Sequence, residues 1–477
     1  VADGAGAGAA VTDVLDMTGG TGNVGLGSGN LGTALTTGTD NVAIGEAALD
    51  AVTTGSDNTA VGDNALGANT TASNNTAVGS SALLANTTGA QNTAVGRNAL
   101  LTATTASNNT AIGRDSMEAT TTGSGNTAVG YDSLKANTTA DNNTAVGYDS
   151  LTANTTGTDN SAVGKDSLAA NTTGNDNTAL GDNALAANTT ANGNTAVGSA
   201  ALALNSTGAN NTVVGYLAAD ANTTGSSNVS VGKSALTANT TADANTAVGF
   251  NALAANTTGA NNVAIGKDAL DSNTTASNNT AVGVDSLQAN TTGTQNVAIG
   301  ANAGKSITTG ADNTIAGYNA GDAITTANSN TAYGSASLST TTTGATNTAI
   351  GAEALQLNET GGSNVAVGYQ ALEENTTADN NTAVGSLALT ANTTGADNSA
   401  LGMQALKDNT TGNYNVAVGK NSLEANTTGA NNTALGRESL ASNTTADNNT
   451  AVGYNALLAN TTGASNVAVG YLALDAN

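Results

Sequence analysis

The chain of 477 residues contains no tryptophan, proline, histidine or cysteine, and Phe250 is its single phenylalanine. Without histidine and cysteine, neither a Ser–His nor a Cys–His nucleophilic pair can be built. Zinc and iron–sulfur sites of the usual kind lose their ligands for the same reason. The composition therefore predicts a protein that is not an enzyme and that carries no cofactor.

Large apolar side chains are also scarce. Hydrophobic residues make up 38% of the chain, but most of them are alanine, valine and leucine, and aromatic residues account for 2%. A wide three-dimensional core needs bulky side chains to fill it. The composition instead favours a narrow core that extends along one axis and is filled by small side chains.

Positive charge is limited to 10 Lys and Arg residues against 35 Asp and Glu residues, which gives a formal net charge of −25 at pH 7. Such an acidic surface repels phosphate backbones, so no nucleic-acid partner is expected. The sequence has no run of 18 or more apolar residues. It therefore predicts no transmembrane helix and no membrane insertion by this segment.

What the chain does contain is a tandem repeat of 17 residues. An asparagine stands at every seventeenth position from Asn41 to Asn466, which gives 26 copies without an insertion, and an earlier copy begins at Asn23, 18 residues before Asn41. One copy is too short to bury its own apolar face, so the copies must stack on one another. We number the positions of each copy 1 to 17 from this asparagine and call one copy a coil.

The consensus coil reads N-T-A-V-G-x-D/N-A/S-L-x-A-N-T-T-G/A-x-x. Positions 2–4 favour a short strand, and the glycine at position 5, present in all 26 copies, indicates a backbone with positive φ or a close neighbour. Leucine at position 9 is the largest recurrent apolar residue, and positions 12–17 are typical of turns. The pattern predicts an all-β fold, a parallel β-roll (β-solenoid) of 17-residue coils, in which the asparagines of positions 1 and 12 stack and hydrogen-bond from coil to coil.

Two coils depart from the consensus in a coordinated way. In the coils that begin at Asn296 and Asn313, position 9 is Gly304 or Gly321 instead of leucine, and position 12 is Ile307 or Ile324 instead of asparagine. A lost leucine and a gained isoleucine, twice over, predict that the isoleucine refills the volume of the missing leucine.

Alanine occupies position 3 in 23 of the 26 copies. Successive residues of a strand point to opposite faces, so valine or isoleucine at position 4 and alanine at position 3 lie on different sides. A solvent-facing position would show polar variety. We therefore interpret position 3 as buried against another chain, which predicts a homo-oligomer with a homotrimeric rod as its simplest closed form. The alternative is that alanine is merely tolerated at a crowded corner of the coil.

Position 6 collects long aromatic and cationic side chains. Every Lys and Arg stands at position 6 or position 10, and eight of the ten aromatic residues stand at position 6. Tyrosine and arginine dominate contacts between proteins, which suggests an adhesive ridge; alternatively, one long side chain per coil shields the strand end and pairs with nearby acids. The candidate contact residues are Tyr131, Tyr148, Tyr216, Phe250, Tyr318, Tyr369, Tyr454, Tyr471, Arg97, Arg114, Lys165 and Lys233.

Two ligand sites are further candidates. Aspartates recur at position 7 (Asp132, Asp149, Asp166, Asp268 and Asp285), and Ca²⁺ would need several of their oxygens at one point. The glycine-rich signature of calcium-binding β-rolls is absent, which favours solvated acids. Flat ice-binding solenoids need outward threonines two residues apart on one face. The recurrent Thr pair here is adjacent, at positions 13 and 14, so its members point differently.

The two ends of the chain differ from its repeats. Residues 1–22 are rich in Gly and Ala and include an apolar run from Val11 to Leu15, so we expect a cap on the first coil or an assembly segment. Residues 23–477 are expected to form one continuous solenoid. The chain stops at Asn477, position 12 of an unfinished copy. Either the sequence is cut from a longer chain, or its uncapped last coil stacks on the next molecule in a head-to-tail filament.

Residues 143–157 (N-T-A-V-G-Y-D-S-L-T-A-N-T-T-G) resemble the head repeats of trimeric autotransporter adhesins and, more closely, related repeats of phage tail fibres and bacterial surface fibre proteins. The variant A-N-A-G…T-T-G at 301–310 is similar to the latter group. The resemblance covers residues 23–477, and the present repeat is longer than that of the adhesins. It implies a left-handed parallel β-roll, three associated chains, and an exposed role in attachment or fibre building.

The repeat and the resemblance together predict a non-catalytic structural fibre, extracellular or at the cell surface, whose partner is another copy of the same chain. The alternative is an adhesin head or phage tail-fibre shaft that recognises a host-cell or surface receptor through the position 6 ridge.

Overall fold

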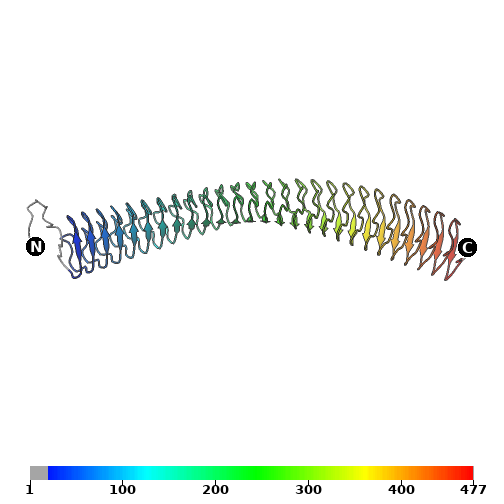
Figure 1. Cartoon of the computed structure of the whole chain (residues 1–477), viewed down its shortest axis with the longest axis horizontal. Coiled ribbons are helices and arrows are strands. Elements are labelled where there is room, and N and C mark those ends of the chain that lie inside the picture. The colour runs from blue at the N-terminus through cyan, green and yellow to red at the C-terminus, as the bar shows by residue number, and fades with distance from the viewer. Residues whose placement is uncertain (1–19, 476–477) are drawn as a thin grey trace, which may run out of the picture. The chain divides into compact units, whose positions relative to one another are not determined.

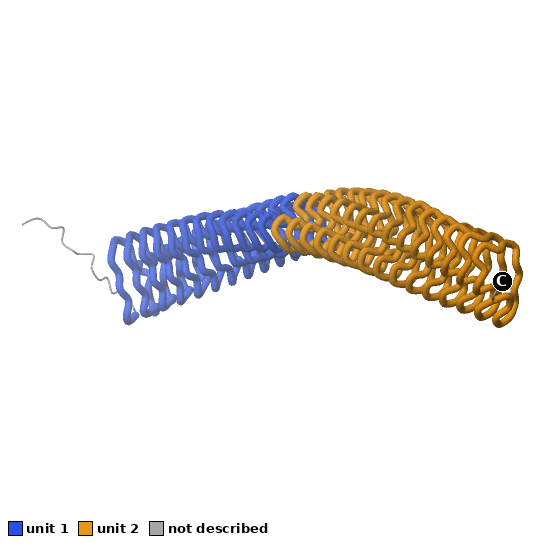
Figure 2. The backbone as a smooth tube through the Cα atoms, turned by 45° about the vertical axis from the view of Figure 1, so that its right-hand side comes forward, with its two compact units in different colours: residues 1–228 blue, residues 229–477 orange. Residues whose placement is uncertain are grey.

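The computed structural model describes residues 20–475, so the segment 1–22 predicted to form a cap lies almost wholly outside the described residues. The chain divides into two compact units, residues 1–228 and 229–477 (Figure 2). Within the described part of each unit, regular structure consists of short strands joined by turns and bends, without a helix. The predicted all-β class is therefore confirmed.

In unit 1, every strand is three residues long and occurs once per coil (Figure 1). The strands are β1 (Val24–Leu26), β2 (Val42–Ile44), β3 (Thr59–Val61), β4 (Thr76–Val78), β5 (Thr93–Val95), β6 (Thr110–Ile112), β7 (Thr127–Val129), β8 (Thr144–Val146), β9 (Ser161–Val163), β10 (Thr178–Leu180), β11 (Thr195–Val197) and β12 (Thr212–Val214).

Unit 2 repeats the same arrangement. Its strands are β13 (Val229–Val231), β14 (Thr246–Val248), β15 (Val263–Ile265), β16 (Thr280–Val282), β17 (Val297–Ile299), β18 (Thr314–Ala316), β19 (Thr331–Tyr333), β20 (Thr348–Ile350), β21 (Val365–Val367), β22 (Thr382–Val384), β23 (Ser399–Leu401), β24 (Val416–Val418), β25 (Thr433–Leu435), β26 (Thr450–Val452) and β27 (Val467–Val469).

Within each unit, every strand pairs in parallel with the strand of the next coil, and equal positions face each other, as Thr178 faces Thr195. The first pair, Val24 and Val42, is 18 residues apart, as the spacing of Asn23 and Asn41 predicts. The strands occupy positions 2–4, so the predicted β-solenoid of 17-residue coils is confirmed. The left hand that the family resemblance implies stays a prediction.

The glycine at position 5 ends each strand for a steric reason. Gly62 has φ of 136°, and a Cβ placed on it would lie 2.6 Å from the carbonyl carbon of Gly79 in the next coil. A side chain at this position would therefore collide with the backbone of the neighbouring coil, and L-residues rarely adopt such a φ.

The strand faces are opposite to the arrangement that we predicted. Ala60 and its equivalents at position 3 are fully buried inside their own chain, whereas Thr59 and Val61, at positions 2 and 4, remain partly exposed. The interpretation that position 3 is buried against a second chain is therefore wrong. The coil interior is narrow, and a Cβ on Gly25 at position 3 would lie 3.2 Å from Leu31 Cδ1 at position 9.

Positions 3 and 9 of one coil share a single interior volume. Where position 3 enlarges from alanine to Val213, position 9 shrinks from leucine to Ala219, and both side chains are buried. Where position 3 becomes Ile315, position 9 becomes Gly321, and Ile315 Cδ1 fills the space 3.0 Å from where a Gly321 Cβ would be. These paired changes keep the packed volume nearly constant.

The predicted isoleucine compensation is confirmed. Ile307 and Ile324 are completely buried. Their Cδ1 atoms lie 3.0 Å and 2.9 Å from the positions that Cβ atoms on Gly304 and Gly321 would take. The isoleucine at position 12 therefore occupies the volume that leucine at position 9 fills elsewhere.

Both predicted asparagine ladders are present, and they share an acceptor. At position 1, the Asn160 backbone N–H and Nδ2 donate to Asn143 Oδ1 at 3.0 and 3.1 Å. At position 12, Asn171 Nδ2 donates to Asn154 Oδ1 at 2.9 Å. Asn160 Nδ2 and Asn171 Nδ2 both also donate to the carbonyl of Gly174, at 2.9 and 3.0 Å. Each asparagine therefore holds two coils together and satisfies an inward carbonyl.

Candidate contact surfaces

The position 6 row contains a stack of three side chains on consecutive coils. The Tyr131 and Tyr148 rings are stacked with centroids 5.2 Å apart and planes 8° apart. The Arg114 guanidinium lies 5.3 Å from the Tyr131 ring centroid. The parallel register of the coils brings equal positions within stacking distance, so these three side chains form one short stack.

Unit 2 has two further contacts of this kind. Tyr454 and Tyr471 stack at 5.5 Å, with Arg437 5.7 Å from the Tyr454 centroid. Lys233 Nζ lies 5.8 Å from the Phe250 centroid. Tyr318 and Tyr369, by contrast, have alanine or serine at position 6 in the coils on both sides. The structure therefore groups part of the predicted ridge into short stacks and leaves these two tyrosines without row neighbours of their kind.

In the described part of the chain, five of the seven cations of the row form ion pairs with acids at position 7, as the shielding interpretation requires. Arg114 Nε lies 2.9 Å from Asp115 Oδ2, Lys165 Nζ 2.6 Å from Asp166 Oδ2, and Lys267 pairs with Asp268. The hydrogen bond and charge of Asp166 raise the pKa of Lys165. Exposed pairs of this kind contribute little to stability, so they neutralise the row more than they strengthen the fold.

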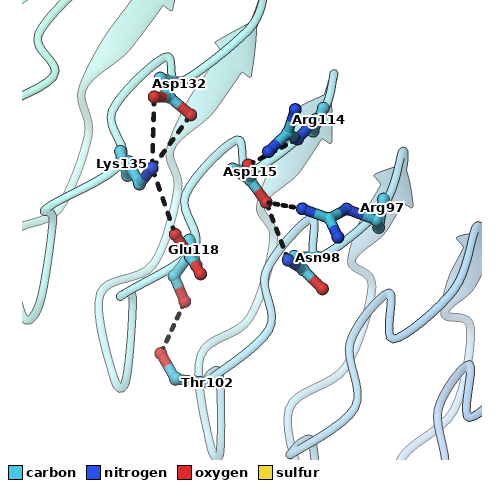
Figure 3. Close-up of polar contacts among 8 residues, drawn as sticks. All are labelled: Arg97, Asn98, Thr102, Arg114, Asp115, Glu118, Asp132 and Lys135. Carbon is cyan, nitrogen blue, oxygen red and sulfur yellow. Dashed lines mark hydrogen bonds and ion pairs between the residues drawn. The ribbon is translucent and has the colours of Figure 1, made fainter.

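Asp115 is the most enclosed carboxylate of this surface (Figure 3). Its side chain is 5% exposed. It forms an ion pair with Arg114, accepts a hydrogen bond from Asn98 Nδ2 at 2.9 Å, and lies 4.0 Å from the Arg97 guanidinium. Beside it, Lys135 Nζ lies 3.2 Å from Asp132 and 3.5 Å from Glu118. Arg97, a predicted contact residue, is thus tied to a carboxylate of the next coil.

Other acidic residues of this surface recur at the same position of consecutive coils, as Asp132, Asp149 and Asp166 do at position 7. Burial raises the pKa of Asp149, and the flanking charges of Asp132 and Asp166 raise it further. Burial likewise raises the pKa of Asp271 and Asp322 at position 10. Among residues 20–475, no three acidic side chains are placed to hold one metal ion. The candidate for calcium therefore stays a prediction without a defined set of ligands.

Positions 2 and 4 form the outer surface of the parallel sheet, which we call the sheet face. Position 2 is Thr, Val or Ser, and position 4 is Val, Ile or Leu except at Ala316 and Tyr333. Several of the position 4 side chains are exposed, including Ile112, Leu180 and Leu401. Neither position carries a charged residue in any coil. Each unit therefore presents an uncharged strip, apolar at position 4 and mostly hydroxyl-bearing at position 2, on a strongly acidic chain.

The sheet face also changes the assessment of the threonines. Thr70 at position 13 is half-buried and donates its hydroxyl to the Thr87 carbonyl at 3.1 Å, whereas Thr71 at position 14 is exposed. The adjacent pair points in different directions, as predicted. Thr59 and Val61, however, lie two residues apart on one outward face. The sequence argument against an ice-binding face therefore does not apply to positions 2 and 4.

The inward direction of position 3 was the feature that the sequence interpretation missed, and the sequence carried a signal for it. The changes at Val213 with Ala219, and at Ile315 with Gly321, already link positions 3 and 9.

No family model, curated protein or solved structure matches the chain. In the described residues, no helix is long and apolar enough to cross a membrane.

Proposed function

We propose that this chain is a non-catalytic structural fibre protein whose solenoids associate side by side through the sheet face. One observation carries the proposal: positions 2 and 4 present a partly exposed strip with no charge, in which an apolar row at position 4 runs beside a row of mostly threonine at position 2, on a chain of net charge −25. Exposed apolar strips of this extent mark association sites in soluble proteins.

A second copy of the chain is the partner that fits this strip. An identical chain has the same rise per coil, so its rows stay in step with these rows over many coils. The face is also the place where two acidic molecules approach with the least repulsion, because their charges lie at other positions. A closed cyclic assembly, with a homotrimer as the form that the repeat resemblance implies, would cover every sheet face.

The role as a fibre outside the cell or on its surface rests on the repeat architecture. A solenoid grows by adding coils and needs no catalytic cleft. The acidic exterior favours solubility in salty surroundings, where self-repulsion is screened. Head-to-tail stacking of molecules would extend such an assembly into a filament.

The test is the mass of the purified protein in sedimentation velocity at near-physiological salt. We expect a discrete oligomer. Val384→Glu places a charge on the sheet face and should yield monomer. Ser386→Glu, two residues away at position 6 of the same coil, adds the same charge and should leave the oligomer intact. A monomeric parent protein, or equal effects of both variants, would refute side-by-side association. If the protein is a monomer that changes the shape of growing ice crystals, the sheet face binds ice instead of a second chain.

An adhesin or tail-fibre shaft is the second candidate, favoured by the stack of Arg114, Tyr131 and Tyr148. Rigid aromatic and arginine side chains supply contact area at low entropic cost. Binding of the fluorescently labelled protein to cells should then fall for Tyr131→Ser with Tyr148→Ser. The matched variant Tyr318→Ser with Tyr369→Ser, which changes tyrosines outside the stacks, should bind normally.

A further inference from the structure

The position 4 row of the sheet face is uniform except at two consecutive coils of unit 2. Position 4 is Ala316 in β18 and Tyr333 in β19, and the two residues are direct neighbours in the parallel ladder. In every other coil this position is Val, Ile or Leu. Tyr333 is 50% exposed. Because side chains of a strand stand roughly perpendicular to the sheet, the Tyr333 ring projects from the face and Ala316 leaves a recess beside it.

The residues that flank this pair mirror each other. Outward from the pair, Ile299 on one side corresponds to Ile350 on the other, and Val282 corresponds to Val367. The two isoleucines are 46% and 42% exposed. The row therefore reads the same in both directions for two coils on either side of the projection and the recess.

We infer that Ala316 and Tyr333 mark the two-fold axis of an antiparallel pair of chains, joined through their sheet faces, with the axis between β18 and β19. The inference rests on the proposed association. In this arrangement each Tyr333 ring enters the recess at the partner's Ala316, and the contact occurs twice. The interface is isologous, so the pair is closed.

The two rows of the sheet face determine the direction of the chains. If two chains lie face to face and run parallel, the two-fold axis follows the solenoid and sets position 4 of one chain over position 2 of the other. If they run antiparallel, the axis follows the strands and sets position 4 over position 4. Only the antiparallel pair buries the apolar rows against each other, and it leaves the mostly hydroxyl-bearing position 2 rows together.

Packing determines the register of the antiparallel pair. With the axis between β18 and β19, Tyr333 faces the partner's Ala316 and Ile299 faces the partner's Ile350, so large and small side chains are matched in every layer. A shift by one coil, with the axis at β19, sets Tyr333 on the partner's Tyr333 and Ala316 on the partner's Ile350. The first layer is then overfilled and the second is left with a void, and both faults are costly in a packed interface.

A parallel pair staggered by one coil satisfies only half of this matching. One Tyr333 then meets the partner's Ala316, but the other Tyr333 meets Ile350 and the other Ala316 meets Ile299. An otherwise repetitive apolar row specifies register weakly, since a slip by one coil restores nearly every contact. The antiparallel pair is therefore the arrangement of two chains in which both unusual residues find a complementary partner.

The arrangement can be measured as a distance between spin labels, because the chain has no cysteine and any introduced thiol is unique. Ala301→Cys and Ser386→Cys place one label per chain at position 6, off the sheet face, in the coils of β17 and β22. At a coil spacing of about 4.8 Å, the two copies of the label should lie about 14 Å apart along the solenoid for Ala301→Cys and about 34 Å apart for Ser386→Cys. Double electron–electron resonance should therefore report a clearly longer distance for Ser386→Cys.

Two further variants test the role of Ala316 and Tyr333. Ala316→Val with Tyr333→Val makes the row uniform and should spread each distance distribution over several registers. Adding Val367→Ala with Val384→Tyr recreates the pair in β21 and β22 and should move the axis between these strands. The separation along the solenoid should then fall to about 5 Å for Ser386→Cys and rise to about 43 Å for Ala301→Cys.

Three outcomes would overturn the inference, and they differ in what they leave standing. A parent chain that sediments as a monomer removes the association and the two-fold pair with it. An oligomer that gives the same short distance for both labels keeps the association but has parallel chains at equal height, as a trimer would. An antiparallel oligomer whose distances stay sharp and unchanged in Ala316→Val with Tyr333→Val keeps the pair of chains but shows that these two residues do not set its axis.

Discussion

The coils that begin at Asn262 and at Asn296 belong to the same unit, yet they fill the same interior with different side chains. In the first, Leu270 packs inward and Asn273 continues the position 12 ladder to Asn256 at 2.8 Å. In the second, Gly304 leaves the centre open and Ile307 fills it. The packed interior volume is therefore kept more nearly constant from coil to coil than the identity of the residue at any one position.

Backbone strain differs between the two kinds of coil. Leu270 has φ of 52°, and nearly every other leucine at position 9 has a similar value. A left-handed conformation costs a non-glycine residue roughly 1–2 kcal/mol, which the buried leucine side chain must offset. Gly304 has φ of 57° and adopts the same turn without that cost. The variant coils therefore replace a strained leucine at position 9 and a buried asparagine at position 12 by an unstrained glycine and a buried isoleucine.

The exchange has a cost in hydrogen bonding. Ile307 has no donor to offer the preceding coil, and Asn290 Oδ1 is buried without a partner among the described residues. The same occurs at Asn86 Oδ1, where the next position 12 residue is Ala103. Because Nδ2 of each coil donates to Oδ1 of the coil before it, a break always strands the last acceptor of a ladder.

The largest expected effect comes from removing the interior leucine of a regular coil. Leu270→Gly should lower the free energy of unfolding by about 3–5 kcal/mol, because the buried side chain leaves a cavity. Adding Asn273→Ile should recover more than half of this loss by refilling it, as Ile307 does. Urea denaturation of the three proteins measures both steps. A double variant no more stable than Leu270→Gly would contradict the shared interior volume.

The reverse exchange tests the variant coil. Gly304→Leu should destabilise the protein by about 1–3 kcal/mol, because the new side chain meets Ile307 Cδ1 and Ile315 Cδ1. Gly304→Leu with Ile307→Asn should reduce this overlap and give Asn290 Oδ1 a donor. Thermal unfolding followed by circular dichroism compares the two variants with the parent. Gly304→Leu alone should not match the parent.

Ladder position sets the cost of losing an asparagine. Asn409→Ala, in the middle of a ladder, strands Asn392 Oδ1, which it contacts at 2.8 Å. Asn290→Ala strands Asn273 Oδ1 but removes the acceptor already stranded on Asn290. Asn409→Ala should therefore cost about 1 kcal/mol or more beyond Asn290→Ala in urea denaturation. Equal losses would show that the stranded acceptor carries no penalty.

A smaller effect concerns Asp322 at position 10 of a variant coil. Burial raises its pKa above the unfolded value of about 3.8, opposed by backbone hydrogen bonds from Asp322 and Ala323. The folded protein therefore binds this proton more tightly than the unfolded chain, so the ionised carboxylate lowers stability at neutral pH. As the pH falls through the folded pKa, the penalty is lost.

Because solvent screens this partly exposed carboxylate, Asp322→Asn should stabilise the protein at pH 7 by well under about 1 kcal/mol, and the gain should vanish below about pH 3.8. Asp312→Asn, which removes the same charge from an exposed turn, is the control and should change stability less at pH 7. The measurement is the thermal midpoint of each variant from pH 3 to 7. A gain that persists at the lowest pH would rule out ionisation as its cause.

The repeat specified the coil, the strand at positions 2–4 and both asparagine ladders, because these depend on local chemistry at a fixed period. It did not specify which side of the strand faces inward. Alternation separates Ala60 from Val61 but does not say where the chain curves, and the lack of polar residues at position 3 suggested burial against a second chain instead of inside the coil. The interior is narrow because Leu66 and the asparagines already fill it, which only three-dimensional closure of the coil reveals.

The candidate surface was predictable to a similar extent. The position 6 row could be read from the spacing, but the stacking of Tyr131 on Tyr148 depends on rotamers and on the identity of neighbours in the row. The sheet face was not predicted, because position 3 was interpreted as the surface that contacts another chain. Once the inward direction of position 3 is known, the uncharged rows at positions 2 and 4 become the principal candidate for association.

The most direct test of the account is cryo-electron microscopy of the purified full chain in near-physiological salt. We predict chains that associate side by side, with the position 4 rows of neighbouring chains packed against one another. Isolated single solenoids with a free sheet face, or assemblies joined through the position 6 row, would contradict it.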